Sequence, residues 1–196
     1  MQKITVELLL SAYASGYFPM ADSRKGTELH WFYPEKRGII PLNAFHIPKS
    51  LSKYIKNNSL IYTTNHAFNE VITACATRGE DTWINDEIIE LYCQLNELGF
   101  AHSVECWMDN TLIGGLYGVS LGGAFFGESM FTRTPNASKC ALVHLVHLLK
   151  DAGYTLLDTQ FVNEHLKQFG VIEISRDEYL EKLEAALQIA PRNCWT

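Results

Sequence analysis

The sequence predicts an α+β fold that contains an antiparallel meander. The first observation is three β-rich runs, AHSVECWMD, TLIGGLYGVSLGG and AFFGESMFT, whose connections are too short for a helical crossover. The second is the helical spacing of apolar residues before and after these runs. The third is the composition: 196 residues, 47% hydrophobic and 19% charged, are typical of a globular chain with one core, or one core plus a small lobe.

Residues 1–43 predict a small N-terminal lobe, and residues 44–196 a larger catalytic domain. A short helix is expected over about residues 5–15, and turns and strands follow it because Pro34 and Pro41 interrupt the pattern. The start of the chain lacks the basic leader of a signal peptide, and no stretch approaches the roughly 18 apolar residues of a membrane span. We therefore expect a cytoplasmic protein with no membrane contact.

Further elements follow in order along the second domain. SLIYTT alternates as a strand, and both HAFNEVITACATR and NDEIIELYCQLNELG have helical spacing. Asn85 is expected to cap the second of these helices and Gly99 to end it. After the three β-rich runs, TPNASKCALVHLVHLLKDAG predicts a long helix that begins near Asn136 and ends at Gly153. The strand YTLLDTQFV comes next, and a last helix starts at the capping box SRDE.

Charge is distributed unevenly along the chain. The net charge is −6, yet residues 1–60 carry eight basic and four acidic groups, whereas residues 61–196 carry eight basic and eighteen acidic groups. If PKSLSKYIKNN is helical, Lys49, Lys53 and Lys56 share one face, where they fit either a phosphate backbone or an ordinary solvated surface.

The cysteines and histidines do not predict a metal site. Five cysteines, widely spaced and never in a CxxC pair, indicate free thiols rather than disulfides or a zinc ribbon. His144 and His147 have a spacing that can bind zinc, but no third ligand is near them in sequence.

The order of the elements is that of the GCN5-related acyltransferase fold, and a fold does not by itself determine chemistry. Acetyl-CoA members of that fold hold pyrophosphate with a Gly-rich loop where the sheet enters its long helix, since only glycine lets backbone N–H groups approach phosphate so closely. The corresponding connection here, FTRTPNASKC, has no glycine. CoA is therefore not expected, and another acyl donor is implied.

Eight segments, in order, resemble one family, the bacterial leucyl/phenylalanyl-tRNA–protein transferases. They are GYFPM (16–20), WFYP (31–34), FHIPKSL (45–51), TWI (82–84), LGFAHSVECW (98–107), LIGGLYGVSLGGAFFGESMF (112–131), NASK (136–139) and LLDTQFVNEH (156–165). The resemblance covers most of the chain. It implies a GCN5-related acyltransferase-like domain that moves Leu or Phe from aminoacyl-tRNA to a protein with N-terminal Arg or Lys, which marks that protein for N-degron degradation.

The implied reaction is aminolysis of an ester by an α-amine. About 10–20% of such an amine is already neutral at pH 7, so most of the acceleration is expected from holding the two reactants together. Neither a metal nor a redox cofactor is expected.

The resemblance assigns the catalytic positions to Asp158 and Gln160. Both lie in one predicted strand, two residues apart, so we expect them to project from the same face. Asp158 could accept the proton while Gln160 orients the amine, or Gln160 could position the amine while a tRNA hydroxyl carries the proton. Without the resemblance, an Asp near a strand end is more often a cap or turn former.

The resemblance also assigns a donor pocket and a buried acid. The residues expected to bind the aminoacyl group and the terminal adenosine are Trp31, Trp83, Leu116, Phe125, Met130 and Leu142. Glu128 is expected near the reaction centre, where it could hold the aminoacyl amine, the ribose or the basic acceptor residue, or simply bond to backbone. Lys49, Lys53 and Lys56 are expected to contact the tRNA acceptor stem.

Two other functions fit parts of the sequence. A CoA-dependent N-acyltransferase shares the element order but needs the missing Gly-rich connection. A non-catalytic tRNA-binding module would have no use for Asp158, Gln160 and Glu128.

Overall fold

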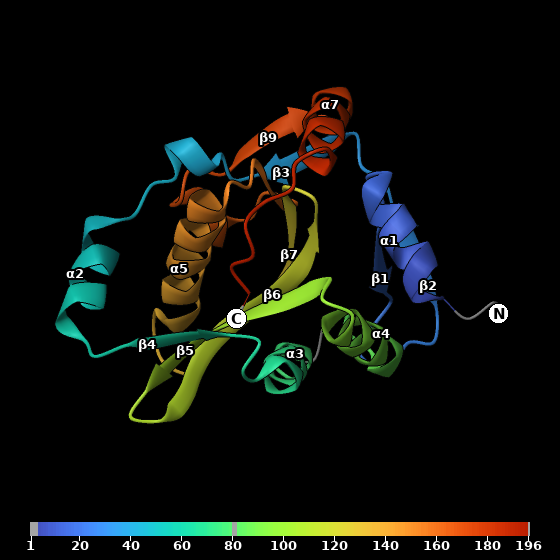
Figure 1. Ribbon diagram of the computed structural model, residues 1–196. Helices are drawn as coiled ribbons and strands as arrows, with labels where there is room; N and C mark the ends of the chain where they lie inside the picture. The colour runs from blue at the N-terminus through green and yellow to red at the C-terminus, as the bar shows by residue number, and fades with distance from the viewer. Residues whose placement is uncertain (1–3, 80–81, 196) are drawn as a thin grey trace.

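The computed structural model describes residues 4–79 and 82–195, and its central feature is a twisted, mixed sheet with helices on both faces (Figure 1). The helices are α1 (Val6–Ala14), α2 (Lys49–Asn57), α3 (Phe68–Ala76), α4 (Asp86–Glu97), α5 (Ala137–Ala152), α6 (Glu164–Lys167) and α7 (Arg176–Leu187), with a short 3-10 turn at Leu42–Ala44. The strands are β1 (Phe18–Ala21), β2 (Leu29–Phe32), β3 (Lys36–Ile39), β4 (Ile61–Thr64), β5 (Ala101–Met108), β6 (Thr111–Leu121), β7 (Ala124–Thr132), β8 (Leu156–Gln160) and β9 (Ile172–Ser175).

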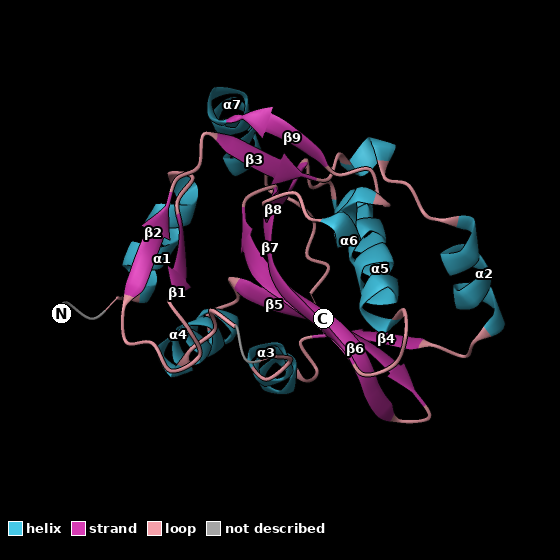
Figure 2. Cartoon of the chain, turned by 180° about the vertical axis from the view of Figure 1, so that it is seen from behind, coloured by secondary structure: helices cyan, strands magenta, loops and turns pink. Residues whose placement is uncertain are grey.

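The main sheet has the strand order β4-β5-β6-β7-β8-β3-β9. The predicted antiparallel meander is confirmed, because β5 pairs with β6 and β6 with β7 in antiparallel register. β8 then adds to β7 in parallel, since the long helix α5 carries the chain back across the sheet. β3 and β9, which the sequence pattern did not predict as members of this sheet, complete it beyond β8 (Figure 2).

Two hydrophobic cores lie on opposite faces of the sheet. One is built with α1, α3, α4 and α7, and includes Tyr13, Tyr92 and Phe126. The other is built mainly with α5 and receives one side of α2. The helices α3, α4 and α5 therefore bury the apolar stripes that their spacing predicted, and the sheet is covered on both sides.

The predicted helix ends agree closely with the structure. The side chain of Asn85 accepts a hydrogen bond from the N–H of Ile88 at 2.9 Å, and Ser175 caps α7 in the same way. Gly153 ends α5 with φ of +92°. Asn136 does precede α5, but its φ is +72° and its side chain makes no capping hydrogen bond. Its contribution is the left-handed backbone, which Asn tolerates better than most residues.

The N-terminal segment forms α1 and the separate antiparallel pair of β1 and β2. The next strand, β3, already belongs to the main sheet. The division after residue 43 stays a prediction. None of the helices in the described part of the chain is long and apolar enough to cross a membrane.

β7 and β8 separate partway along their length, and this separation prepares the functional site. Their parallel pairing runs from Ala124 opposite Leu156 to Phe126 opposite Asp158. Beyond that point β8 pairs with β3 on its other side, while β7 continues to Thr132 beside β6.

A β-bulge lies on β7 where the strands part. Tyr117 faces Ser129 and Gly118 faces Gly127, so Glu128 is the extra residue. A Cβ added to Gly118 would lie 2.2 Å from the carbonyl oxygen of Phe126, so glycine is required beside the bulge. Bulges of this kind re-aim a side chain, here that of Glu128.

Candidate active site

A cavity of about 450 Å³ occupies the space between the separated strands. This volume is within the range of small-molecule sites in proteins. Its lining comes from β6, β7, β8, the first half of α5 and the segment after β8. The lining residues are Arg78, Leu116, Tyr117, Gly127, Glu128, Ser129, Met130, Phe131, Thr132, Ser138, Leu142, Leu145, Leu157, Thr159, Gln160, Asn163, His165 and Leu166.

One wall of the cavity is apolar and contains three of the predicted donor-pocket residues. Leu116, Met130 and Leu142 all line it. Leu145 and Leu157 also line it, although nothing in the sequence distinguishes them from ordinary core leucines. A wall of flexible and branched aliphatic side chains is suited to an apolar ligand group.

The three predicted aromatic residues lie outside this lining. Phe125 is fully buried and stacks on Trp195, with ring centroids 5.3 Å apart. No local pattern predicts this partner, because Trp195 is distant from Phe125 in the sequence. Trp31 is 37% exposed on β2, and Trp83 packs against the core beside α4. Contact of Trp31 and Trp83 with a terminal adenosine stays a prediction.

Asp158 lies in a buried ion pair with Arg37, and neither side chain is more than 2% exposed. Arg37 Nε donates to both carboxylate oxygens at 3.0 and 3.1 Å, and Nη2 donates to Oδ2 at 2.6 Å. The remaining Arg37 nitrogen donates to the carbonyl oxygen of Gly16, and the guanidinium lies between the rings of Phe18 and Tyr179, 4.5 Å from each centroid. Tyr179 also donates to Asp158 Oδ2 at 2.8 Å.

This environment makes Asp158 a counter-ion. Burial disfavours the Arg37 cation, but the adjacent carboxylate outweighs that effect and raises the pKa of Arg37 above its ordinary value. Burial, followed by the charge of Asp158, raises the pKa of Tyr179 well above 10. Nothing in the sequence distinguishes Arg37 from an exposed cation, because its burial and its pairing with Asp158 depend on the fold.

Gln160 is held in place by its own backbone. Its φ is +56°, in the left-handed region that non-glycine residues rarely adopt, and its N–H donates to Asp158 Oδ1 at 2.8 Å. Its side chain reaches the cavity, where Nε2 lies 3.5 Å from Glu128 Oε1. The two predicted catalytic residues therefore meet, but only Gln160 lines the cavity.

Glu128 is the acidic group of the cavity, and two tyrosines hold it. Tyr13 donates to Oε1 at 2.8 Å, Tyr92 donates to Oε2 at 3.5 Å, and the two hydroxyls also bond to each other. Burial raises the pKa of Glu128 to about 8, although the tyrosine hydrogen bonds and Arg37 act in the opposite direction. The carboxyl group is therefore mostly protonated at pH 7.

Stability is expected to decrease as pH rises toward 8 because of Glu128. In the unfolded chain this group ionises near 4.5, whereas in the folded protein it keeps its proton up to about pH 8. Its contribution is fully present below pH 4.5 and lost as pH rises through 8. Urea unfolding at several pH values between 5 and 8.5 measures this, and Glu128→Gln should flatten the profile. Glu181→Gln, on the exposed side of α7, is the control. Identical profiles for wild type and Glu128→Gln would contradict the assignment.

The three predicted tRNA-contacting lysines are all exposed on α2. None of them pairs with a carboxylate of the described residues, and α2 itself contains no acid. The helix lies at the outer side of α5 (Figure 1). Its free cationic face is therefore available to an anionic partner.

The connection from β7 to α5 offers few free backbone N–H groups to a pyrophosphate. The N–H groups of Arg133 and Thr134 both donate to the carbonyl oxygen of Ile113, at 2.8 and 3.2 Å, and that of Ala137 donates to Thr134 at 3.1 Å. This geometry agrees with the glycine-free sequence and disfavours a CoA site there.

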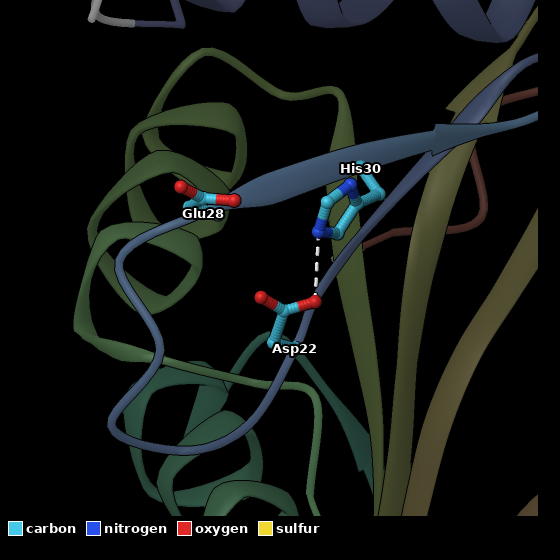
Figure 3. Close-up of side chains that lie close together, drawn as sticks. All are labelled: Asp22, Glu28 and His30. Atoms are coloured by element: carbon cyan, nitrogen blue, oxygen red, sulfur yellow. Dashed lines mark ion pairs between the residues drawn. The ribbon is translucent and has the colours of Figure 1, made fainter.

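Within residues 4–79 and 82–195, one group of three potential metal ligands comes together, at Asp22, Glu28 and His30 (Figure 3). Their ligand atoms lie within 4.8 Å of one another, and all three residues are exposed. His30 Nε2 lies 2.7 Å from Asp22 Oδ1, so this imidazole is already paired. Because all three residues are exposed and His30 is paired with Asp22, we interpret this group as a surface contact.

Comparison with protein families gives two matches that cover nearly the whole chain. Residues 39–184 match a model described as leucyl/phenylalanyl-tRNA protein transferase, and residues 2–35 match the N-terminal domain of the same description. A leucyl/phenylalanyl-tRNA–protein transferase of Paramagnetospirillum magneticum is 55% identical over 190 residues, which are 95% of this chain and 91% of the relative. One from Zymomonas mobilis is 53% identical over 187 residues, covering 94% and 70%.

Among solved structures, the crystal structure of FemX matches with a TM-score of 0.57 and 11% identity, over 88% of this chain and 68% of that chain. This likeness concerns the fold alone. Together with the meander, the parallel β7 and β8 pair and their separation, it confirms the predicted α+β fold of the GCN5-related acyltransferase type.

Proposed function

The chain belongs to the leucyl/phenylalanyl-tRNA–protein transferase family, and from this premise we propose how it acts and on what. Membership makes it an aminoacyltransferase that transfers an amino acid from aminoacyl-tRNA to a protein. The amino acid is leucine or phenylalanine, and the acceptor is the α-amine of an N-terminal Arg or Lys.

The observation that carries the proposal is the two-sided cavity between β7 and β8. Its aliphatic wall suits the side chain of the donor, and its polar end at Glu128 and Gln160 suits an ester and an amine. We propose that this wall fits side chains unbranched at Cβ, within the limit of about 1–3 kcal/mol per methylene by which pockets discriminate among apolar groups.

In this mechanism Gln160 orients the attacking amine and Asp158 orients Gln160. The carboxylate of Asp158 accepts hydrogen bonds from Arg37, Tyr179 and the Gln160 backbone, so it holds Gln160 in place and does not itself line the cavity. The fraction of amine that is neutral at pH 7, about 10–20%, supplies the nucleophile. The released proton passes to the departing ribose oxygen.

Replacing Lys49, Lys53 and Lys56 together with Gln is expected to weaken tRNA binding and to reduce its salt dependence. Each lost phosphate contact lowers the slope of log K against log salt concentration by about 0.7–0.9, so a reduction of up to about 2–3 is expected. Filter binding at several salt concentrations measures the slope. A control triple variant with Lys25, Lys150 and Lys182, all exposed, removes the same charge elsewhere. Equal slopes for the two triple variants would remove α2 from the tRNA site.

The function is tested by mixing the protein with leucyl-tRNA and a peptide that begins with Arg. Mass spectrometry should detect the peptide extended by one leucine. Isoleucyl-tRNA, which is branched at Cβ, and a peptide that begins with Gly are the controls and should give little product. Absence of extension with leucyl-tRNA, or equal extension of the Gly peptide, would contradict the proposal.

We further propose a cellular role from the product. A protein that begins with Leu or Phe carries an N-degron, so transfer would mark the acceptor for degradation in the cytoplasm. Comparing the half-life of an Arg-initial reporter in cells with and without this protein tests that role, with a Gly-initial reporter as control.

A further inference from the structure

Three buried side-chain oxygens lack a hydrogen-bond partner in the described part of the chain, and the residues that carry them all line the cavity. They are Tyr117 Oη, Ser129 Oγ and Thr159 Oγ1. Buried hydroxyls are nearly always bonded in folded proteins, because an unmade bond is costly. Their presence in one cavity therefore points to a ligand whose polar atoms complete these bonds.

Tyr117 is the best placed of the three. It is fully buried at the centre of β6, and the rings of Tyr92 and Phe68 pack edge-on against it at 5.6 and 5.9 Å. This packing holds the ring and with it the position of the hydroxyl. Ser129 has the thiol of Cys75 as a neighbour, which gives its hydroxyl a weak alternative interaction.

The phenol is available as a donor. Burial, followed by the influence of Tyr92 and Glu128, raises the pKa of Tyr117 well above 10, so it keeps its proton. Glu128, the nearby acid, is mostly protonated at pH 7 as well. A negative charge that develops in this part of the cavity therefore meets an O–H donor and little opposing charge.

We propose that the Tyr117 hydroxyl donates a hydrogen bond to the ester carbonyl oxygen of the bound aminoacyl group and stabilises the oxyanion that forms there. This inference rests on the proposed function. The amine nitrogen bonds to the carbonyl carbon, and the electron pair of the C=O bond moves to the oxygen that Tyr117 holds. When that pair returns, the bond to the ribose oxygen breaks, and this oxygen takes the proton that the amine releases.

The carbonyl oxygen is assigned to Tyr117 because of the polarity of the groups present. The carbonyl oxygen of an ester only accepts hydrogen bonds, so it needs a donor. Gln160 Nε2 already donates to Glu128, and Glu128 is bonded to Tyr13 and Tyr92. The Tyr117 hydroxyl is a donor that has no partner among the described residues.

The test is Tyr117→Phe, which removes only the oxygen. Single-turnover transfer from leucyl-tRNA is expected to fall about 10²-fold, with KM for leucyl-tRNA nearly unchanged. Thermal stability should not decrease, because the hydroxyl has no partner to lose. Tyr154→Phe is the matched control, since its hydroxyl bonds to Ser120 and Trp195 outside the cavity, and it should transfer at the wild-type rate.

Two ligands distinguish stabilisation of the oxyanion from binding of the uncharged ester. A leucyl phosphonate of adenosine has a tetrahedral, anionic centre, whereas a leucyl amide of adenosine is planar and neutral. Tyr117→Phe should bind the phosphonate at least about tenfold more weakly and the amide equally well. A wild-type transfer rate in Tyr117→Phe, or a raised KM with unchanged kcat, overturns the inference. Absence of transfer by the wild type instead overturns the proposed function.

Discussion

Asp158→Ala is expected to lower the free energy of unfolding by about 3–5 kcal/mol, because it leaves the buried Arg37 cation without its counter-ion. The loss also removes the acceptors of Tyr179 and of the Gln160 N–H. Urea unfolding monitored by tryptophan fluorescence measures it. Glu173→Ala, which breaks the exposed pair between Glu173 and Lys36 on the neighbouring strands, should have little effect.

The comparison of these two variants decides between two roles for Asp158. If Asp158 is a counter-ion, its loss is first a loss of stability, and low activity in Asp158→Ala follows from a displaced Gln160. If Asp158→Ala were as stable as wild type yet inactive, the carboxylate would have to act on the reacting groups, and the assignment made here would be wrong.

Gln160→Ala is expected to reduce transfer at least about 10²-fold with a much smaller effect on stability. The Gln160 side chain makes one long hydrogen bond, of 3.5 Å to Glu128, so its removal leaves no buried charge without a partner, whereas misplacing the amine costs rate. Single-turnover transfer and urea unfolding measure the two effects. Gln188→Ala, at the exposed end of α7, is the control.

A second substitution at this position separates the effect of the backbone conformation from the effect of the side chain. Gln160→Gly relieves the left-handed φ of +56°, so it should not destabilise the fold, yet it removes the amide as completely as alanine does. Equal loss of transfer in the Ala and Gly variants would show that the side chain matters. Near-normal transfer in either variant would exclude Gln160 from positioning the amine.

Local sequence signals predicted the fold well wherever structure is local. The caps at Asn85 and Ser175, the stop at Gly153 and the meander of β5 to β7 depend on neighbouring residues, so their patterns could be recognised directly. β3 and β9 have four residues each, and their place is decided by pairing across the whole chain. No local pattern contains that information.

The candidate site shows the same difference between features set by local sequence and features set by long-range contacts. The cavity lining includes five of the predicted site residues, Leu116, Met130, Leu142, Glu128 and Gln160, and their roles toward the substrates stay predictions. The partners that hold the site were missed, because Arg37 and Tyr179 meet Asp158 only in three dimensions. Phe125 was assigned to the donor pocket for its aromatic ring and its motif. Its ring stacks on Trp195, which is distant in sequence, and its contact with a substrate stays a prediction.

The guanidinium of Arg37 joins parts of the polypeptide that are synthesised at very different times. Gly16 emerges from the ribosome long before Tyr179. Until α7 has emerged, the buried cation and carboxylate lack the Tyr179 ring and remain exposed to water. A nascent chain that stops before α7 should therefore be inert, and transfer should begin only after this helix has been synthesised.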